Sequence, residues 1–501
     1  MDTIRELYKI GRGPSSSHTM GPAKAAITVL EKFPSADHFI VELWGSLAAT
    51  GKGHLTDWII IETLKPREVE IIWKPNFVHE FHTNGIRFIA FDSNNQELGD
   101  WIVFSVGGGT IKGIEEIGEK TVSIQQTYPH RSLEAIMERC KENNKELWEY
   151  VEYYEGKEIW NFLRIIYQAM NEAIQRGLTN DGILPGPLKL KRRAKEMYEK
   201  VTSQDDPLFM TNKMFAYALA VSEENGNGGV IVTAPTCGSA GVIPGMLKAM
   251  EEAYHLSEEQ VLRGLAIGGL MGNLIKHNAT ISGAEGGCQA EIGSACSMAS
   301  AMAVYFLWGS IEQIEYAAES GLEHHLGMTC DPVGGFVQIP CIERNAIVST
   351  RSLNTALYCM STDGSHTISF DEVVQTMLET GRDLCSAYRE TSLWGLAKYY
   401  EKKILDEKEK KKAQKEFDEV FSMFVWNQGA GYFASEIGPS TLFAAYSYAK
   451  NEEEKGNTKE AILKGLIEKF GEKNPEVSTM FKNTHWGSVT LIWLGSFLCK
   501  L

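Results

Sequence analysis

The chain has 501 residues, of which 43% are hydrophobic and 23% are charged, and its formal net charge is −16. This composition is ordinary for a globular protein of about two to four domains. The negative charge argues against a general affinity for nucleic acid or anionic membranes, because phosphate binding requires clustered Lys and Arg.

The first residues contain no basic region followed by an apolar stretch, so the sequence predicts no secretory signal there. Near the C-terminus the longest apolar run, Val489 to Leu498, is too short to span a bilayer. We therefore expect a cytoplasmic protein that binds neither nucleic acid nor membrane.

Residues 1 to about 135 mix strand patterns with one early helix. The apolar spacing of Pro22–Phe33 predicts that helix. Gly107–Gly109 predicts a loop. Four stretches rich in β-branched and aromatic residues predict strands: Phe39–Leu43, Trp58–Ile61, Arg87–Phe91 and Trp101–Val106. The expected fold class is α+β, with a small mixed N-terminal domain over residues 1–135.

The next residues, 136–160, are polar and rich in Glu, Lys and Tyr, which predicts a connector. Residues 161–400 predict a large, mostly α-helical catalytic domain whose loops carry the chemistry. Its clearest helical patterns are Thr211–Asn225, Val242–Tyr254, Ser257–His277 and Phe370–Tyr400. Residues 401–501 are a C-terminal extension without a motif, and its charged start, 401–415, predicts a solvated helix or a linker.

A run of hydroxyl and imidazole side chains precedes the first predicted helix: Ser15, Ser16, Ser17, His18 and Thr19. Backbone amides at a helix N-terminus can hold a carboxylate, and these side chains can add hydrogen bonds. The alternative is an elaborate N-cap. A cap needs only one such residue, so the run favours anion binding.

Two further loops carry polar residues suited to a ligand. Lys52 and His54 lie beside glycines, where a ligand-binding loop and an ordinary exposed turn are equally compatible with the peptide. His54 is a candidate acid or base because its ordinary pKa is near neutral. Asn278 has the groups to bind a substrate carboxylate or amine, although polar loop residues more often bond to backbone.

The chain has nine Cys, and an odd number in a cytoplasmic protein does not predict a disulfide framework. Cys288, Cys330 and Cys341 each lie beside Gly or Pro. Three thiolates on a cubane iron–sulfur cluster leave one iron open as a Lewis acid. The alternative is that these are buried core thiols, and spacing alone does not exclude it. Helical patterns around Cys140, Cys359 and Cys385 favour the core there, and Cys237 and Cys296 stay open.

These peptides together resemble the iron–sulfur-dependent L-serine dehydratases over roughly residues 1–400. Gly13–Thr19 and Gly45–His54 look like the family's smaller, β-type domain. Four more peptides look like its larger, α-type domain: Leu184–Pro187, Thr233–Thr236, Ser282–Glu285 with Cys288, and Cys330–Pro332 with Cys341. The intervals of 42 and 11 residues between the three Cys also look like the family's cluster spacing.

The resemblance implies conversion of L-serine to pyruvate and ammonia on a [4Fe-4S] cluster held by the three Cys. It implies His54 as the base, with His18 and Lys276 as rivals. The implied substrate-binding residues are Ser15, Ser16, Ser17, Thr19, Lys52, Asn278 and Ser282. A homo-oligomer is expected because soluble enzymes commonly form symmetric assemblies.

The chain departs from this family pattern after the peptide Tyr388–Ala397, where about a hundred residues follow. One hypothesis is that Cys499, near the end, ligates the open iron when substrate is absent. Competing functions are a lyase of the same kind that acts on threonine, and an iron–sulfur or zinc sensor of amino acids. A pyridoxal-phosphate dehydratase would need a Schiff-base Lys; no Lys motif indicates one, and the three Cys would have no role.

Overall fold

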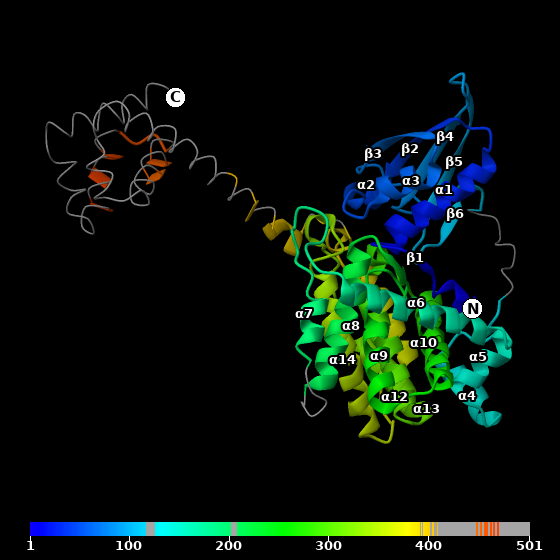
Figure 1. Cartoon of the computed structure of the whole chain (residues 1–501). Helices are drawn as coiled ribbons and strands as arrows, with labels where there is room; N and C mark the ends of the chain where they lie inside the picture. The colour runs from blue at the N-terminus through cyan, green and yellow to red at the C-terminus, as the bar shows by residue number, and fades with distance from the viewer. Residues whose placement is uncertain are drawn as a thin grey trace. The chain divides into compact units, whose positions relative to one another are not determined.

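The structure is a computed structural model of the chain. It describes residues 1–116, 126–201, 208–390, 392 and 394–400, and scattered short stretches beyond residue 400. Met1–Tyr400 form one compact unit and Glu401–Leu501 another (Figure 1). Most of the predicted C-terminal extension lies outside the described residues, as does Cys499.

A five-stranded sheet forms the upper part of the first unit in Figure 1. Its strands, in spatial order, are β3 (Glu68–Lys74), β2 (His38–Trp44), β4 (Gly85–Phe91), β5 (Glu97–Ser105) and β6 (Ile111–Gly113). β2 and β3 are parallel and the other pairs are antiparallel. Alternate residues of β2 share one hydrophobic core with two helices, α1 (Gly21–Lys32) and α3 (Thr56–Leu64). The small α+β part is therefore confirmed.

One predicted strand is wrong, because Trp58–Ile61 lies inside the helix α3. Two parallel strands need a crossover connection, and α3 is that connection between β2 and β3. Ile59, Ile60 and Leu64 are buried on one side of α3, whereas Trp58 and Ile61 are exposed. The apolar side chains of this run thus form the buried face of a helix. An edge strand of the sheet is β3, which the sequence did not predict.

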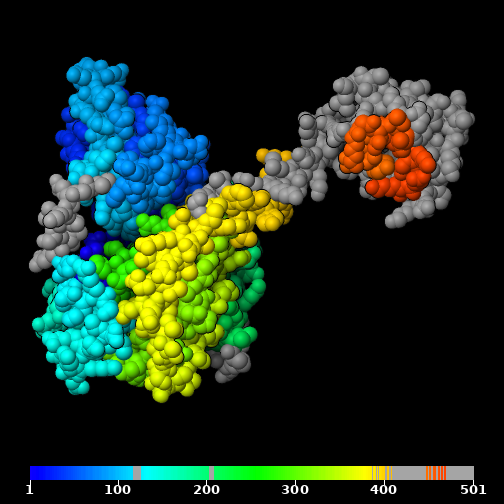
Figure 2. All heavy atoms as spheres, turned by 180° about the vertical axis from the view of Figure 1, so that it is seen from behind, coloured from blue at the N-terminus to red at the C-terminus, as the bar shows by residue number. Residues whose placement is uncertain are grey.

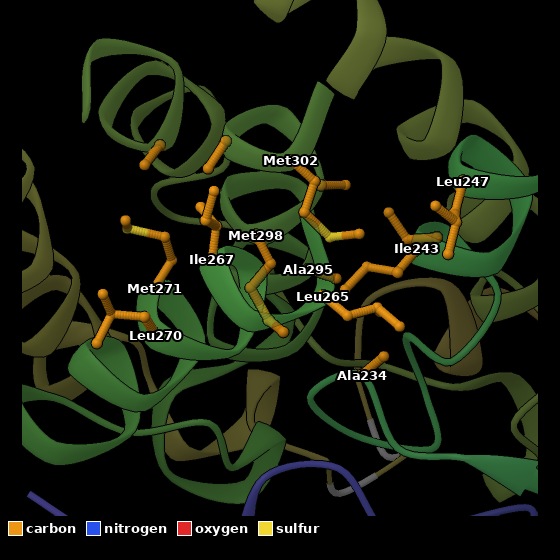
Figure 3. Close-up of a cluster of buried hydrophobic side chains, with 14 of the residues drawn as sticks. Ala234, Ile243, Leu247, Leu265, Ile267, Leu270, Met271, Ala295, Met298 and Met302 are labelled. Carbon is orange, nitrogen blue, oxygen red and sulfur yellow. The ribbon is translucent and has the colours of Figure 1, made fainter. Parts of the chain in front are cut away.

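The larger part of the first unit is helical. Its longer helices are α4 (Leu133–Glu142), α5 (Leu147–Glu155), α6 (Ile159–Thr179), α8 (Phe209–Gly226), α9 (Val242–Tyr254), α10 (Glu258–Asn278), α12 (Ser294–Phe306), α13 (Ile311–Glu323), α14 (Cys341–Met360) and α15 (Phe370–Asp383). α12 is buried along almost its whole length, and its many Ala and Ser residues let neighbouring helices approach closely. Figure 3 shows its side chains against those of α9 and α10. Among the described residues, no helix combines the length and the apolar character needed to cross a membrane.

Two segments outside residues 161–400 also belong to the helical core. Residues 136–160, the predicted connector, form most of α4 and all of α5, whose buried side chains join that core. The first eight residues join it too, through Met1, Ile4, Leu7 and Tyr8. The chain then enters the small part through β1 (Ile10–Arg12), which pairs antiparallel with β7 (Val230–Val232) of the helical part.

The last predicted helix, Phe370–Tyr400, is shorter than expected, because α15 ends at Asp383. Leu384 has an extended ψ of 124°, which takes the chain out of the helix. Further on, Cys330 N donates to Tyr388 O (2.8 Å), and Glu390 N donates to Cys330 O (2.8 Å). Figure 2 shows the late part of the unit, in yellow, running over the helical body.

Candidate active site

The Ser/His peptide forms one tight turn ahead of α1. Ser16–Met20 is a single π-helical turn, and Ser15 Oγ caps it by accepting a hydrogen bond from His18 N (3.0 Å). Thr19 Oγ1 donates to His54 O (2.7 Å), which ties this turn to the second predicted loop. All five side chains from Ser15 to Thr19 are buried. Ser15 is therefore an N-cap, as the alternative interpretation predicts. The other four side chains are polar groups buried beside it that capping does not explain.

His18 is held through both ring nitrogens. Its Nε2 lies 3.1 Å from Ser46 Oγ, and its Nδ1 lies 2.8 Å from Ser17 Oγ. Ser46 Oγ donates its one hydrogen to Glu390 O (3.3 Å), so it accepts a hydrogen bond from His18 Nε2. His18 therefore carries its hydrogen on Nε2, and its Nδ1 accepts the hydrogen bond from Ser17 Oγ. Burial, together with the nearby His54, holds the pKa of His18 well below its usual range. His18 is thus a neutral, fully bonded imidazole.

His54 has one nitrogen without a partner. Thr50 Oγ1 donates to Ser46 O (3.0 Å), so His54 Nδ1, 3.0 Å from the same hydroxyl, must be the donor between them. His54 Nε2 is therefore unprotonated, and among the described residues it has no hydrogen-bond partner. Burial lowers the pKa of His54 to about 4. A buried lone pair of this kind suits a general base.

Glu390, which the sequence analysis missed, joins the two histidines. Its Oε1 lies 3.8 Å from His18 Nδ1 and 3.9 Å from His54 Nε2. Its backbone has a φ of +57°, a strained value for a side-chain-bearing residue. Burial, followed by the charges of Glu291 and Cys288, raises the pKa of Glu390 well above its usual range.

The three predicted metal ligands come together from three separate elements. Cys288 precedes a π-helical turn, Cys330 lies in the strand-like bridge to Arg389, and Cys341 is the first residue of α14. All three are buried free thiols. Cys288 Sγ, Cys330 Sγ and a Glu291 carboxylate oxygen all lie within 4.8 Å of one another. Cys341 and the other described Cys are also unpaired, and none of them belongs to a group of this tightness.

The three thiols also influence one another electrostatically. A hydrogen bond with Cys288, then burial, raises the pKa of Cys330, and burial followed by the charge of Cys288 raises the pKa of Cys341. The Arg344 guanidinium interacts with all three. Thiolates in such a place need a positively charged partner. Three converging buried thiols form a donor set that fits an iron–sulfur cluster.

Glu291 and a glycine close this site from the other side. Glu291 Oε1 accepts from Thr236 Oγ1 (2.7 Å), and its Oε2 lies 4.0 Å from Cys330 Sγ. A Cβ at Gly283 would lie 2.6 Å from Glu291 Oε2 and 3.4 Å from Cys330 Sγ. Only glycine lets the backbone approach the carboxylate and the thiol this closely.

Of the remaining predicted residues, Ser282 alone lies at this site. It directly precedes Gly283, and among the described residues its buried Oγ has no hydrogen-bond partner. Lys52 Nζ lies over the Trp73 ring, 5.5 Å from its centroid. Asn278 Nδ2 donates to Arg131 O (2.7 Å). Lys276 Nζ donates to Glu6 O at 3.4 Å. None of these contacts is with the histidines or the thiols.

Comparison with known proteins gives two matching family models. Residues 121–397 match the model of the serine dehydratase alpha chain, and residues 3–70 match that of the serine dehydratase beta chain. An L-serine dehydratase of Streptomyces coelicolor is 39% identical over 451 residues, which cover 79% of this chain and 98% of that protein. L-serine dehydratase 1 of Escherichia coli is 37% identical over 448 residues, covering 79% of this chain and 99% of that protein.

Proposed function

Because the chain belongs to the serine dehydratase family, with alpha-chain and beta-chain regions in one polypeptide, we propose that it converts L-serine to pyruvate and ammonia with a [4Fe-4S] cluster. One observation carries this proposal. Among the described residues, the unprotonated His54 Nε2 has no hydrogen-bond partner and lies 3.9 Å from Glu390 Oε1, and Glu390 also interacts electrostatically with Cys288, one of the three buried thiols.

The cofactor assignment rests on the thiols. Cys288, Cys330 and Cys341 would hold the cluster, and its open iron would supply Lewis acidity to the substrate hydroxyl. Ser282, whose Oγ is buried without a partner, and Arg344 stand beside these ligands. We prefer an iron–sulfur cluster to a structural zinc ion at this site, because a structural zinc ion usually has four protein ligands.

The protein's own groups supply binding and proton transfer. The buried hydroxyls of Ser15 to Thr19, at the start of α1, hold the substrate carboxylate. Glu390 takes the ammonium group, which favours the ionised form of its carboxyl group. His54 Nε2 removes the α-proton, and neutral His18 keeps the serine turn in place. Loss of the hydroxyl as water leaves an aminoacrylate, which tautomerises and is hydrolysed to pyruvate and ammonia.

The test is pyruvate release from L-serine by anaerobically purified protein, repeated after brief exposure to air. The proposal predicts turnover that disappears in air and returns with iron and sulfide. Faster turnover of L-threonine would move the substrate assignment to the related lyase. Protein with a full cluster and no turnover on either amino acid would contradict the enzymatic function and favour a sensor.

A further inference from the structure

A cavity of about 700 Å³ lies between α13 and α14 and opens to solvent. We call it the α13–α14 groove. Its wall includes Glu319, Glu323 and Arg351, together with Tyr316, Tyr358 and His366. No lining residue belongs to the candidate active site, and the volume is sufficient for a small organic molecule.

Glu319 is a buried carboxylate without a partner. Glu319 is only 6% exposed, and its carboxylate has neither a hydrogen bond nor an ion pair with any of the described residues. Of the other acidic residues nearby on α13, Glu315 Oε1 accepts a hydrogen bond from Phe370 N (2.7 Å), and Glu323, whose Oε2 lies 2.9 Å from His324 Nδ1, is exposed. Burial, followed by the charges of Glu323 and Glu315, raises the pKa of Glu319 to about 7. A buried carboxylate of this kind is costly unless a cation pairs with it.

Arg351 provides the opposite charge in the same groove. Its Nη1 donates to His325 Nε2 (3.5 Å), and within the part of the chain that the structure describes it pairs with no carboxylate. The guanidinium therefore keeps donors free in a geometry that matches a carboxylate. One groove thus contains a carboxyl group without a partner and a cation that lacks a carboxylate partner.

The rest of the wall favours an organic ligand over a metal ion. The Tyr316 ring stacks on His366 with centroids 4.2 Å apart, and Tyr316 Oη donates to Tyr358 Oη (3.3 Å). Aromatic faces of this kind attract organic cations. Among the described residues, Glu319 and Glu323 belong to no set of three metal-ligand atoms within 4.8 Å of one another.

We propose that the α13–α14 groove binds a small zwitterion, with its ammonium group on Glu319 and its carboxylate on Arg351. A simple amine would leave Arg351 unpaired, and a simple carboxylate would leave Glu319 unpaired. Only a ligand with both an ammonium group and a carboxylate can pair with Glu319 and Arg351 at once. This site is distinct from the site proposed for serine.

Calorimetric titration of the full anaerobic chain tests this. The probes are glycine, β-alanine, 4-aminobutyrate and 6-aminohexanoate, which differ in the spacing of their charges, with butylamine and butyrate as single-charge controls. At least one zwitterion should bind more tightly than either control. Glu319→Gln and Arg351→Gln should each weaken it at least tenfold. Glu379→Gln, an exposed residue of α15, is the matched charge control and should not.

Both groove variants should keep wild-type serine turnover without added ligand, which separates this inference from the proposed catalytic function. Arg351 is exposed, so its replacement should fold even where Glu319→Gln does not. Three results would overturn the proposal: no zwitterion binds better than the controls, binding survives in both groove variants, or binding is lost in His18→Asn and kept in Glu319→Gln. The last result would place the ligand in the active site.

Discussion

His54 and His18 lie with their ring centroids 4.6 Å apart, yet only one has a free lone pair. In His54→Asn, the amide can still donate to Thr50, but no group replaces Nε2. We expect kcat for serine to fall by about 10²- to 10⁴-fold, the usual contribution of a general base. Steady-state kinetics with iron content measured in parallel would check this. An active His54→Asn protein with a full cluster would exclude His54 as the base.

Glu390 has a different expected effect, because we assign it to ammonium binding and not to proton removal. Glu390→Gln keeps the shape and removes the charge. We expect kcat/KM to fall about 10- to 100-fold, since a hydrogen bond to a charged group contributes about 1.5–3 kcal/mol, with the larger part in KM. Glu343→Gln on α14, where Glu343 is exposed beside Arg193, is the control. Equal loss in both variants would show that general charge, and not ammonium binding, causes the effect.

At this scale the sequence identified the residues with unusual neighbours. His18, His54 and the three Cys lie beside Gly, Pro or repeated Ser, and the structure places them together. Glu390 lies in an ordinary peptide and had no such signal. Its role depends on a positive φ and on pairing with Cys330, 60 residues away, which local patterns do not encode. Lys52 and Asn278 stay predictions, and in the structure their side chains contact Trp73 and a backbone carbonyl.

Among the elements, the loop that carries His54 contacts the helical part through a glycine. A Cβ at Gly53 would lie 2.3 Å from Gly335 O, a backbone atom that cannot move aside easily. Gly53→Ala should therefore shift the His54 loop and lower kcat/KM at least tenfold, while the thiols keep their iron. Activity and iron content measured together would check this. Wild-type kinetics would show that the loop tolerates the displacement.

A second element-scale prediction concerns Glu223 near the end of α8. Its carboxylate accepts from Arg193 N (2.6 Å) and Ala194 N (3.2 Å) at the start of α7 (Ala194–Glu199). Burial nevertheless raises the pKa of Glu223 to about 7. The folded state then binds the proton more tightly than the unfolded state, so this contribution is full below the unfolded pKa, near 4.5, and is lost as pH rises to about 7.

Glu223→Gln, which mimics the protonated group, should match the wild type in melting temperature at pH 4.5. At pH 8 it should be the more stable of the two, by up to about 3 kcal/mol for a shift of this size. Thermal melts of both proteins at several pH values, with Glu379→Gln as the exposed control, would show it. A constant difference across pH would contradict the raised pKa.

Four of the five helices for which the sequence predicted bounds agree with α1, α8, α9 and α10 to within two residues, because their periodic patterns are long. Prediction from the sequence failed where tertiary contacts determine the secondary structure. Trp58–Ile61 has strand-like composition, but the parallel pairing of β2 and β3 requires a helix between them. The pattern after Asp383 is apolar enough for a helix, yet the chain there pairs with Cys330 to complete the site.

At the scale of the whole molecule, Met1–Tyr400 is one compact unit, and the family models end within it, at residue 397. A protein that ends at Tyr400 should therefore keep its fold and at least half of the full-length kcat. Serine turnover and circular dichroism of the two proteins would check this. Loss of turnover with an intact fold and cluster would assign residues 401–501 a part in catalysis. Changed air sensitivity alone would support the hypothesis for Cys499.

The pairing of β1 with β7 has a consequence for synthesis on the ribosome. Ile10 pairs with Val232, so the two strands are made 222 residues apart. At about 5–20 residues per second, the first strand waits about 10–40 s for its partner. During that interval Ile4, Leu7 and Tyr8 have no helical core to enter. The nascent chain thus exposes an apolar leading segment, and we expect a ribosome-associated chaperone to bind it until α10 has left the exit tunnel.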